Sequence, residues 1–238
     1  YLKMKTAIIV SGIFRHIEDA MPSWMFDGDY FLITQDTYQL PRDTSEEHSI
    51  LHELEKCKDK FKAVIVLDKL MAEFEYSTTL INQTWKWKII YNFLVPYIEK
   101  YNYERFIIIR PDSYLHVFGN IDELKIEPNI LHSTSVVSRD GMGFMFANDT
   151  FMICGKDVLK IISNFYDYIE PISAYGSIHE HFADYLNLKN IIVTAEVLRH
   201  AQTFQLRPGL EHMFENNKLK DKYVVNDLYK RIQEWKKD

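Results

Sequence analysis

Cysteine is scarce in this chain, with only Cys57 and Cys154 among 238 residues. Two cysteines are too few to build a disulfide framework or a cysteine-ligated zinc site. A reducing compartment is the simplest setting for such a chain. We therefore expect a cytoplasmic protein, in the host cytoplasm if the source is a virus.

Long apolar runs and a surplus of positive charge are also missing. No stretch reaches the roughly 18–20 apolar residues of a membrane span, and residues 1–5 (YLKMK) show no signal-peptide cleavage pattern. The formal net charge is −6, whereas a dedicated nucleic-acid binder needs a basic face to neutralise phosphates. We therefore expect no membrane span and no nucleic-acid partner. A local basic pocket would still suit an anionic ligand.

Glycine is sparse as well, and the familiar glycine-rich phosphate-binding motifs are absent from the sequence. The segment after the first apolar run, 11–15 (SGIFR), has a single glycine and does not match the G-x-G-x-x-G fingerprint. No P-loop sequence occurs either. These absences argue against a nicotinamide-dependent oxidoreductase.

The chain does contain an alternation of apolar strands and amphipathic helices through its first half. Short runs rich in β-branched residues favour buried strands at 6–10, 30–34, 63–67 and 106–109. The expected helices are 16–25, 45–58, 78–101, 156–168, 178–188 and 226–236, and the later strands are 129–133, 143–147 and 191–195. This pattern predicts an α/β fold with a Rossmann-like, mostly parallel central sheet flanked by helices.

The chain shows no linker-like shift in composition, so we expect one domain over residues 1–238. On the long helix at 78–101, we expect Trp85 to pack against the core and Trp87 to lie at the surface.

Polar residues follow the apolar strands of the first half. They are Ser11, Gly12 and Arg15 after the first strand, Gln35 and Asp36 after the second, Asp68 after the third, and Arg110-Pro111-Asp112 after the fourth. Because open α/β sheets bind ligands at the carboxyl ends of their strands, this recurrence predicts a binding site there. The alternative interpretation is that strands simply end in polar loops.

The Arg110-Pro111-Asp112 segment is the most informative of these. A carboxylate just beyond a buried strand can ligate Mg²⁺ or Mn²⁺, which bridge to diphosphates and offset the charge of a leaving nucleoside diphosphate. The alternative is a surface Asp112 that pairs with a neighbouring arginine. We expect Asp112 to lie in a loop on which little packing depends.

Several segments, taken in order, resemble a group of GT-A-like glycosyltransferases known from bacterial surface-polysaccharide loci and large DNA viruses. They are residues 8–15 (IIVSGIFR), a helix with Gln83 before the strand that ends in Arg110-Pro111-Asp112, 148–155 (NDTFMICG) and 179–186 (HEHFADYL). The resemblance covers residues 5–198. It implies a hexosyl- or pentosyltransferase that moves a sugar from a nucleoside-diphosphate sugar to a glycan or other hydroxyl acceptor.

The same resemblance implies a division of labour along the chain. The nucleotide-binding half would span about residues 5–115 and the acceptor-side half about 116–238. The turn after the first strand would line the nucleotide and its phosphates. The aspartates after the second and third strands would contact uracil, guanine or ribose, and one face of the long helix would approach the donor. The implied donor-binding residues are Ser11, Gly12, Arg15, Asp36, Asp68, Gln83, Lys86 and Arg110.

Asp112 would bind the metal, Mn²⁺ or Mg²⁺, or the sugar, according to this resemblance. The sequence departs from the family pattern here, because GT-A enzymes usually have Asp-x-Asp and Arg110 replaces the first aspartate. Arg110 could itself neutralise phosphate charge, since a guanidinium is always cationic. Neutralisation of the phosphate charge by a metal ion and neutralisation by Arg110 thus both stay open.

An inverting transfer also needs a carboxylate that deprotonates the acceptor hydroxyl. The candidates are Glu180, which opens a predicted helix, and Asp149. Each has a structural alternative, because acids are favourable in a first helical turn and Asn-Asp-Thr is typical of a turn. Inversion and retention both stay open. Since fold does not decide function, the alternative is a non-catalytic nucleotide- or carbohydrate-binding module of the same fold.

Overall fold

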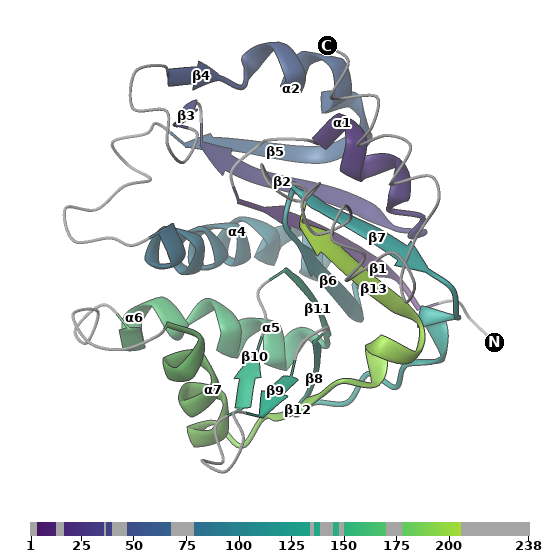
Figure 1. Cartoon of the computed structure of the whole chain (residues 1–238), viewed down its shortest axis with the longest axis vertical. Helices are drawn as coiled ribbons and strands as arrows, with labels where there is room; N and C mark the ends of the chain where they lie inside the picture. Colours follow the sequence, from purple (N-terminus) through teal and green to yellow (C-terminus); the bar gives the residue numbers. More distant parts are fainter. Residues whose placement is uncertain are drawn as a thin grey trace, which may run out of the picture.

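The computed structural model describes residues 4–12, 17–35, 37–39, 47–67, 79–133, 136–138, 145–147, 150–169 and 178–205. Figure 1 shows the arrangement of these segments as a central sheet with helices on both sides. The helix predicted at 226–236 lies outside the described residues. Within the described part of the chain, no helix is both long and apolar enough to cross a membrane.

The described residues form a central sheet of seven strands in the order β12-β8-β11-β6-β1-β2-β5. Its first-half strands, β1 (Thr6–Ser11), β2 (Asp29–Gln35), β5 (Phe61–Leu67) and β6 (Arg105–Ile109), pair in parallel. β11 (Phe151–Cys154) runs antiparallel to both neighbours, and β8 (Ile130–Ser133) and β12 (Ile192–Thr194) complete the sheet. The predicted α/β class with a mostly parallel sheet is therefore confirmed.

The central strands are apolar on both sides because both faces of the sheet are covered. Along β1, Ala7 and Ile9 belong to one buried cluster, while Ile8 and Val10 belong to another. All of these side chains are at most 1% exposed. This explains why β1 reads as a continuous apolar run, as expected for a doubly covered parallel strand.

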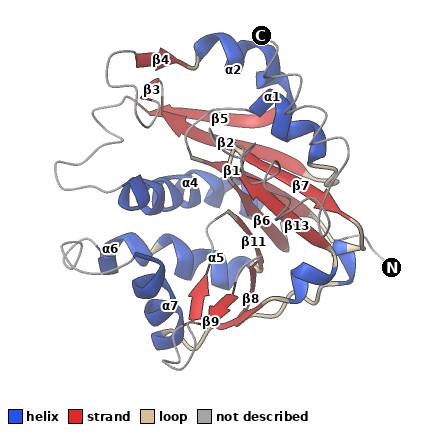
Figure 2. Ribbon diagram, in the orientation of Figure 1, coloured by secondary structure: helices blue, strands red, loops and turns tan. Residues whose placement is uncertain are grey.

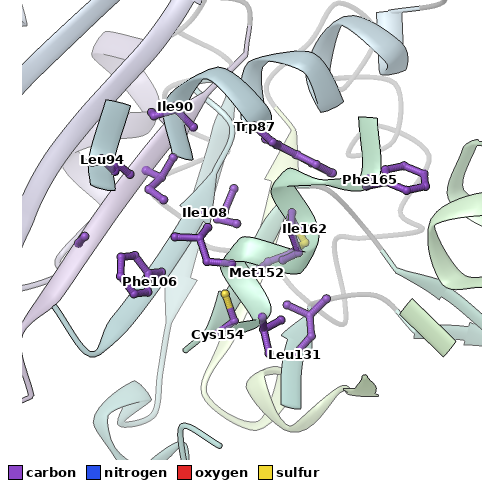
Figure 3. Packing of buried hydrophobic residues seen from close by; sticks show 14 of the residues in the cluster. Trp87, Ile90, Leu94, Phe106, Ile108, Leu131, Met152, Cys154, Ile162 and Phe165 are labelled. Atoms are coloured by element: carbon purple, nitrogen blue, oxygen red, sulfur yellow. The ribbon is translucent and has the colours of Figure 1, made fainter. Parts of the chain in front are cut away.

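One face of the sheet packs against a group of helices. These are α4 (Thr79–Tyr101), α5 (Lys156–Ser163), α6 (Phe165–Ile169) and α7 (Ile178–Leu188). In Figure 3, Trp87, Ile90 and Leu94 of α4 gather over Ile108 of β6, with Met152 of β11 nearby. The long, apolar face of α4 is thus the main cover of this side.

The other face is covered by shorter elements. They are α1 (Ile17–Ala20), the 3-10 turn η1 (Met21–Ser23), α2 (Leu51–Cys57) and an antiparallel ribbon of β7 (Ser113–Val117) and β13 (Ala201–Gln205). Figure 2 shows the ribbon beside the sheet. Trp24 ties η1 to this ribbon, because its indole Nε1 donates to the Ser113 carbonyl at 2.7 Å.

The remaining elements are short. Small antiparallel pairs are formed by β3 (Thr37–Gln39) with β4 (Glu47–Ser49) and by β9 (Val136–Ser138) with β10 (Met145–Ala147). Single 3-10 turns lie at η2 (Lys58–Lys60), η3 (Ile121–Glu123) and η5 (Glu196–Arg199). Both cysteines are buried free thiols, and burial raises the pKa of each.

Some predicted boundaries are wrong, each for a physical reason. The helix predicted at 45–58 begins only at Leu51, because Glu47–Ser49 pairs with Thr37–Gln39 as a strand instead. The helix predicted at 156–168 is two helices that meet at Asn164. The backbone N–H of Asn164 donates to the Lys160 and Ile161 carbonyls at the end of the first helix.

Candidate functional site

The order of the strands places a topological switch between β1 and β6. From β1 the sheet grows through β2 to β5, and after α4 the chain returns to the opposite side of β1 as β6. The segments that follow β1 and β6 both pass to the same face, where α1 and η1 pack against β7. Open α/β sheets bind ligands at the carboxyl ends of their strands, so this end of the sheet is the candidate site. Val10 is in register with Ile109, so Ser11 and Arg110 leave the sheet side by side.

The end of β1 turns sharply at Gly12. Ser11 is fully buried, and Gly12 has a φ of 142°, a conformation that side-chain-bearing residues rarely adopt. The Gly12 amide donates to the Ile33 carbonyl of β2 at 3.2 Å, which fixes the turn against the neighbouring strand. Without a Cβ, the backbone at Gly12 permits a close approach by a ligand.

At the end of β6, Arg110 and Asp112 form an ion pair across a tight turn. The Arg110 Nε lies 3.0 Å from Asp112 Oδ1, and Nη2 lies 3.2 Å from Oδ2, so the guanidinium meets the carboxylate side-on through both oxygens. The Ser113 amide donates to the Arg110 carbonyl at 3.1 Å, and the Arg110 amide donates to the Thr150 carbonyl at 3.3 Å. These bonds close the turn and tie it to the segment before β11.

Burial of this pair differs from the expectation for Asp112. Its side chain is 1% exposed, and that of Arg110 is 20% exposed. The expectation that little packing depends on Asp112 is therefore wrong, because the turn folds the carboxylate inward under the guanidinium.

A second cation lies at the same edge of the sheet, at the end of β2. Lys86 projects from α4 and donates from Nζ to Gln35 Oε1 at 3.1 Å. Lys86 is 2% exposed and Gln35 is 5% exposed. Gln35 was expected at the end of its strand, but its hydrogen bond with Lys86 was not predicted. The available signal was a polar residue at the end of an apolar strand.

Several predicted site residues cannot be placed. Arg15, Asp36, Asp68 and Asp149 lie outside the described residues, and of Gln83 only the backbone, within the first turns of α4, is described. Their assigned roles stay predictions.

Glu180 occupies the first turn of α7, as expected, and its side chain is partly buried. The helix touches α4, because Phe182 packs against Trp87 with ring centroids 5.4 Å apart. Trp87 is 4% exposed, so its expected surface position is wrong. Trp85 is partly buried and packs against the core, as expected. The role of Glu180 as a base stays a prediction.

The described side chains do not fit a divalent metal well. Among these residues, no group of at least three His, Cys, Asp or Glu side chains is placed to hold an ion. Mg²⁺ and Mn²⁺ favour sets of oxygen ligands, whereas both oxygens of Asp112 already face a guanidinium. The predicted metal role of Asp112 is not supported by this donor set.

Comparison with known proteins gives a likeness of fold only. No protein-family model matches the sequence, and no curated protein matches it. Among solved structures, the chain is similar to the apo-form glycosyltransferase GlyE of Streptococcus pneumoniae TIGR4, with a TM-score of 0.49 and 15% identity. The match covers 82% of this chain and 46% of that one, so the chain spans less than half the length of the protein it matches.

Proposed function

We propose that this chain is a glycosyltransferase that moves a sugar from a nucleoside-diphosphate sugar to a hydroxyl acceptor. The observation that carries the proposal is a positive-φ glycine and two largely buried cations near the carboxyl ends of three neighbouring strands. Gly12 and Arg110 follow β1 and β6, and Lys86 of α4 donates to Gln35 at the end of β2. Family resemblance of the same segments supports a sugar nucleotide as the anionic ligand.

The proposed chemistry needs stabilisation of the leaving group. As the bond between the anomeric carbon and the diphosphate oxygen breaks, its electron pair passes to that oxygen. Cations fixed beforehand at this position stabilise the developing charge without reorganising. Arg110 and Lys86 supply such cations, and Gly12 lets the diphosphate approach the backbone.

The acceptor hydroxyl must lose its proton as its oxygen bonds to the anomeric carbon. A carboxylate within hydrogen-bond reach takes this proton and typically contributes about 10²–10⁴-fold in rate. We propose Glu180 for this role, with Asp149 as the competing candidate. In this scheme the half of the chain at about residues 5–115 binds the donor, and the half at about 116–238 builds the acceptor side. The residues near the nucleotide would be Ser11, Arg15, Asp36, Asp68 and Gln83.

Incubation of the purified chain with a panel of UDP- and GDP-sugars, with and without Mn²⁺, tests the function. Release of the nucleoside diphosphate, or transfer to added glycans, supports the enzyme. Binding of a nucleotide without any release over long incubation supports the non-catalytic module instead. Failure to bind any member of the panel contradicts both.

The choice of base is tested by comparing Glu180→Gln with Asp149→Asn at saturating donor. The variant that removes the base should lose most of its kcat while its donor affinity barely changes. Small, equal losses in the two variants would show that neither carboxylate is the base, and a retaining mechanism would follow.

A further inference from the structure

We infer that the donor diphosphate is neutralised by Arg110, assisted by Lys86, and not by a divalent metal on Asp112. The inference rests on the proposed function and concerns its charge balance. Its starting point is the side-on pair between Arg110 and Asp112 at the end of β6.

The pair leaves Asp112 poorly suited to hold a metal ion. The carboxylate is 1% exposed, and each of its oxygens faces a guanidinium nitrogen, at 3.0 and 3.2 Å. A divalent ion bound to either oxygen would lie within a few ångströms of a fixed positive charge. Like charges at such separations repel strongly where water is largely excluded.

The same geometry makes Asp112 a positioning residue for Arg110. Contacts through both Nε and Nη2 fix the plane of the guanidinium as well as its place. A guanidinium held in this way presents a rigid fork that matches phosphate oxygens. Arg110 keeps 20% of its side chain exposed beside this buried carboxylate, and it follows β6 directly next to the end of β1.

Lys86 adds positive charge from the other side of β1. β2 and β6 are the two neighbours of β1, so Gln35, with Lys86 bound to it, and Arg110 flank the end of β1. We expect a diphosphate at the end of β1 to lie between these two side chains.

Titration calorimetry with UDP and GDP, in EDTA and in Mn²⁺, tests the inference. We expect the wild-type affinity to agree within about two-fold between the two conditions. Arg110→Gln should weaken nucleotide binding about 10–100-fold in both conditions, which is the effect expected from losing a hydrogen bond to a charged group. The nucleotide affinity of Arg110→Lys, which keeps the charge but loses the planar guanidinium, should lie between those of the wild type and Arg110→Gln. This variant also tests the inference if Arg110→Gln does not fold.

Arg105→Gln is the matched control. Arg105 is the buried arginine at the opposite end of β6, where it pairs with Asp122 at 2.6 Å. Its replacement should lower stability and leave nucleotide affinity unchanged. The positioning role is tested by adding Asp112→Asn to Arg110→Gln, which should weaken nucleotide binding no further, because Asp112 acts only through Arg110.

The outcomes separate this inference from the proposed function. Nucleotide binding that requires Mn²⁺, or unchanged affinity in both Arg110 variants, overturns the inference and leaves the sugar-transfer proposal standing. No nucleotide binding under any condition overturns the proposed function and the inference together. Electron paramagnetic resonance of Mn²⁺ alone gives a further readout: tight binding abolished by Asp112→Asn would contradict the inference.

Discussion

Replacing Asp112 by alanine should destabilise the fold as well as impair function. The substitution removes the two carboxylate oxygens that face the Arg110 guanidinium, next to a cation whose side chain is 20% exposed. Breaking a fully buried ion pair costs about 3–5 kcal/mol, and a hydrogen bond to a charged group contributes about 1.5–3 kcal/mol. Because Arg110 keeps some contact with water, we expect a loss of about 2–3 kcal/mol in the free energy of unfolding.

Urea denaturation of the wild type, Asp112→Ala, Arg110→Gln and the double variant measures this loss. The denaturation midpoint should fall with an unchanged slope, which marks a change in stability and not in compactness. For a chain of this size each kcal/mol corresponds to about 2–4 °C in Tm. The double-variant cycle should give a coupling of more than about 0.5 kcal/mol, as for residues in direct contact.

A loss of stability near zero in Asp112→Ala would contradict the buried ion pair. If Asp112→Ala unfolds within about 0.5 kcal/mol of the wild type, as surface substitutions do, the carboxylate is solvated and the pair does not exist. Additive losses in the cycle would show that the two side chains do not act on one another.

Three further outcomes are expected. Gly12→Ala should cost about 1–3 kcal/mol of stability, because φ is 142° there, and should weaken nucleotide binding in calorimetry. Lys86→Met should weaken nucleotide binding, while Lys88→Met, which removes a partly exposed lysine of the same helix that pairs with Asp167, should not. Burial raises the pKa of Asp29, but hydrogen bonds from Lys62 and Tyr103 outweigh it and hold the pKa below 3.8. Lys62→Met should therefore lower the free energy of unfolding by about 0.2–1 kcal/mol above pH 3.8. This difference between variant and wild type should shrink as the pH falls below that value and Asp29 becomes protonated.

The main strands could be predicted because their signal is local. β1, β2, β5 and β6 are apolar, β-branched runs, and each observed boundary lies within two residues of the expected one. β7 and β13 were not predicted, because each is a strand only through its pairing with the other. The two partners are far apart in the sequence, with Ala201 opposite Val117. Alternating polar and apolar residues beside a turn gave no local sign of that partner.

The location of the site followed from sequence more readily than its internal contacts. Strand ends are visible in the apolar pattern, so Ser11, Gly12 and Arg110 could be assigned to one edge of the sheet. The burial of Lys86 depends on how α4 rotates against β2, and only the packed fold sets that rotation. The inward turn of Asp112 likewise depends on hydrogen bonds to the distant Thr150 carbonyl.

The most direct test of the account is a structure of the chain with a nucleoside diphosphate bound. We predict that the diphosphate lies against Gly12, between the ends of β1 and β6, with its oxygens within hydrogen-bond distance of the Arg110 guanidinium. A nucleotide bound anywhere else, or a diphosphate held at this edge without contact to Arg110, would contradict it.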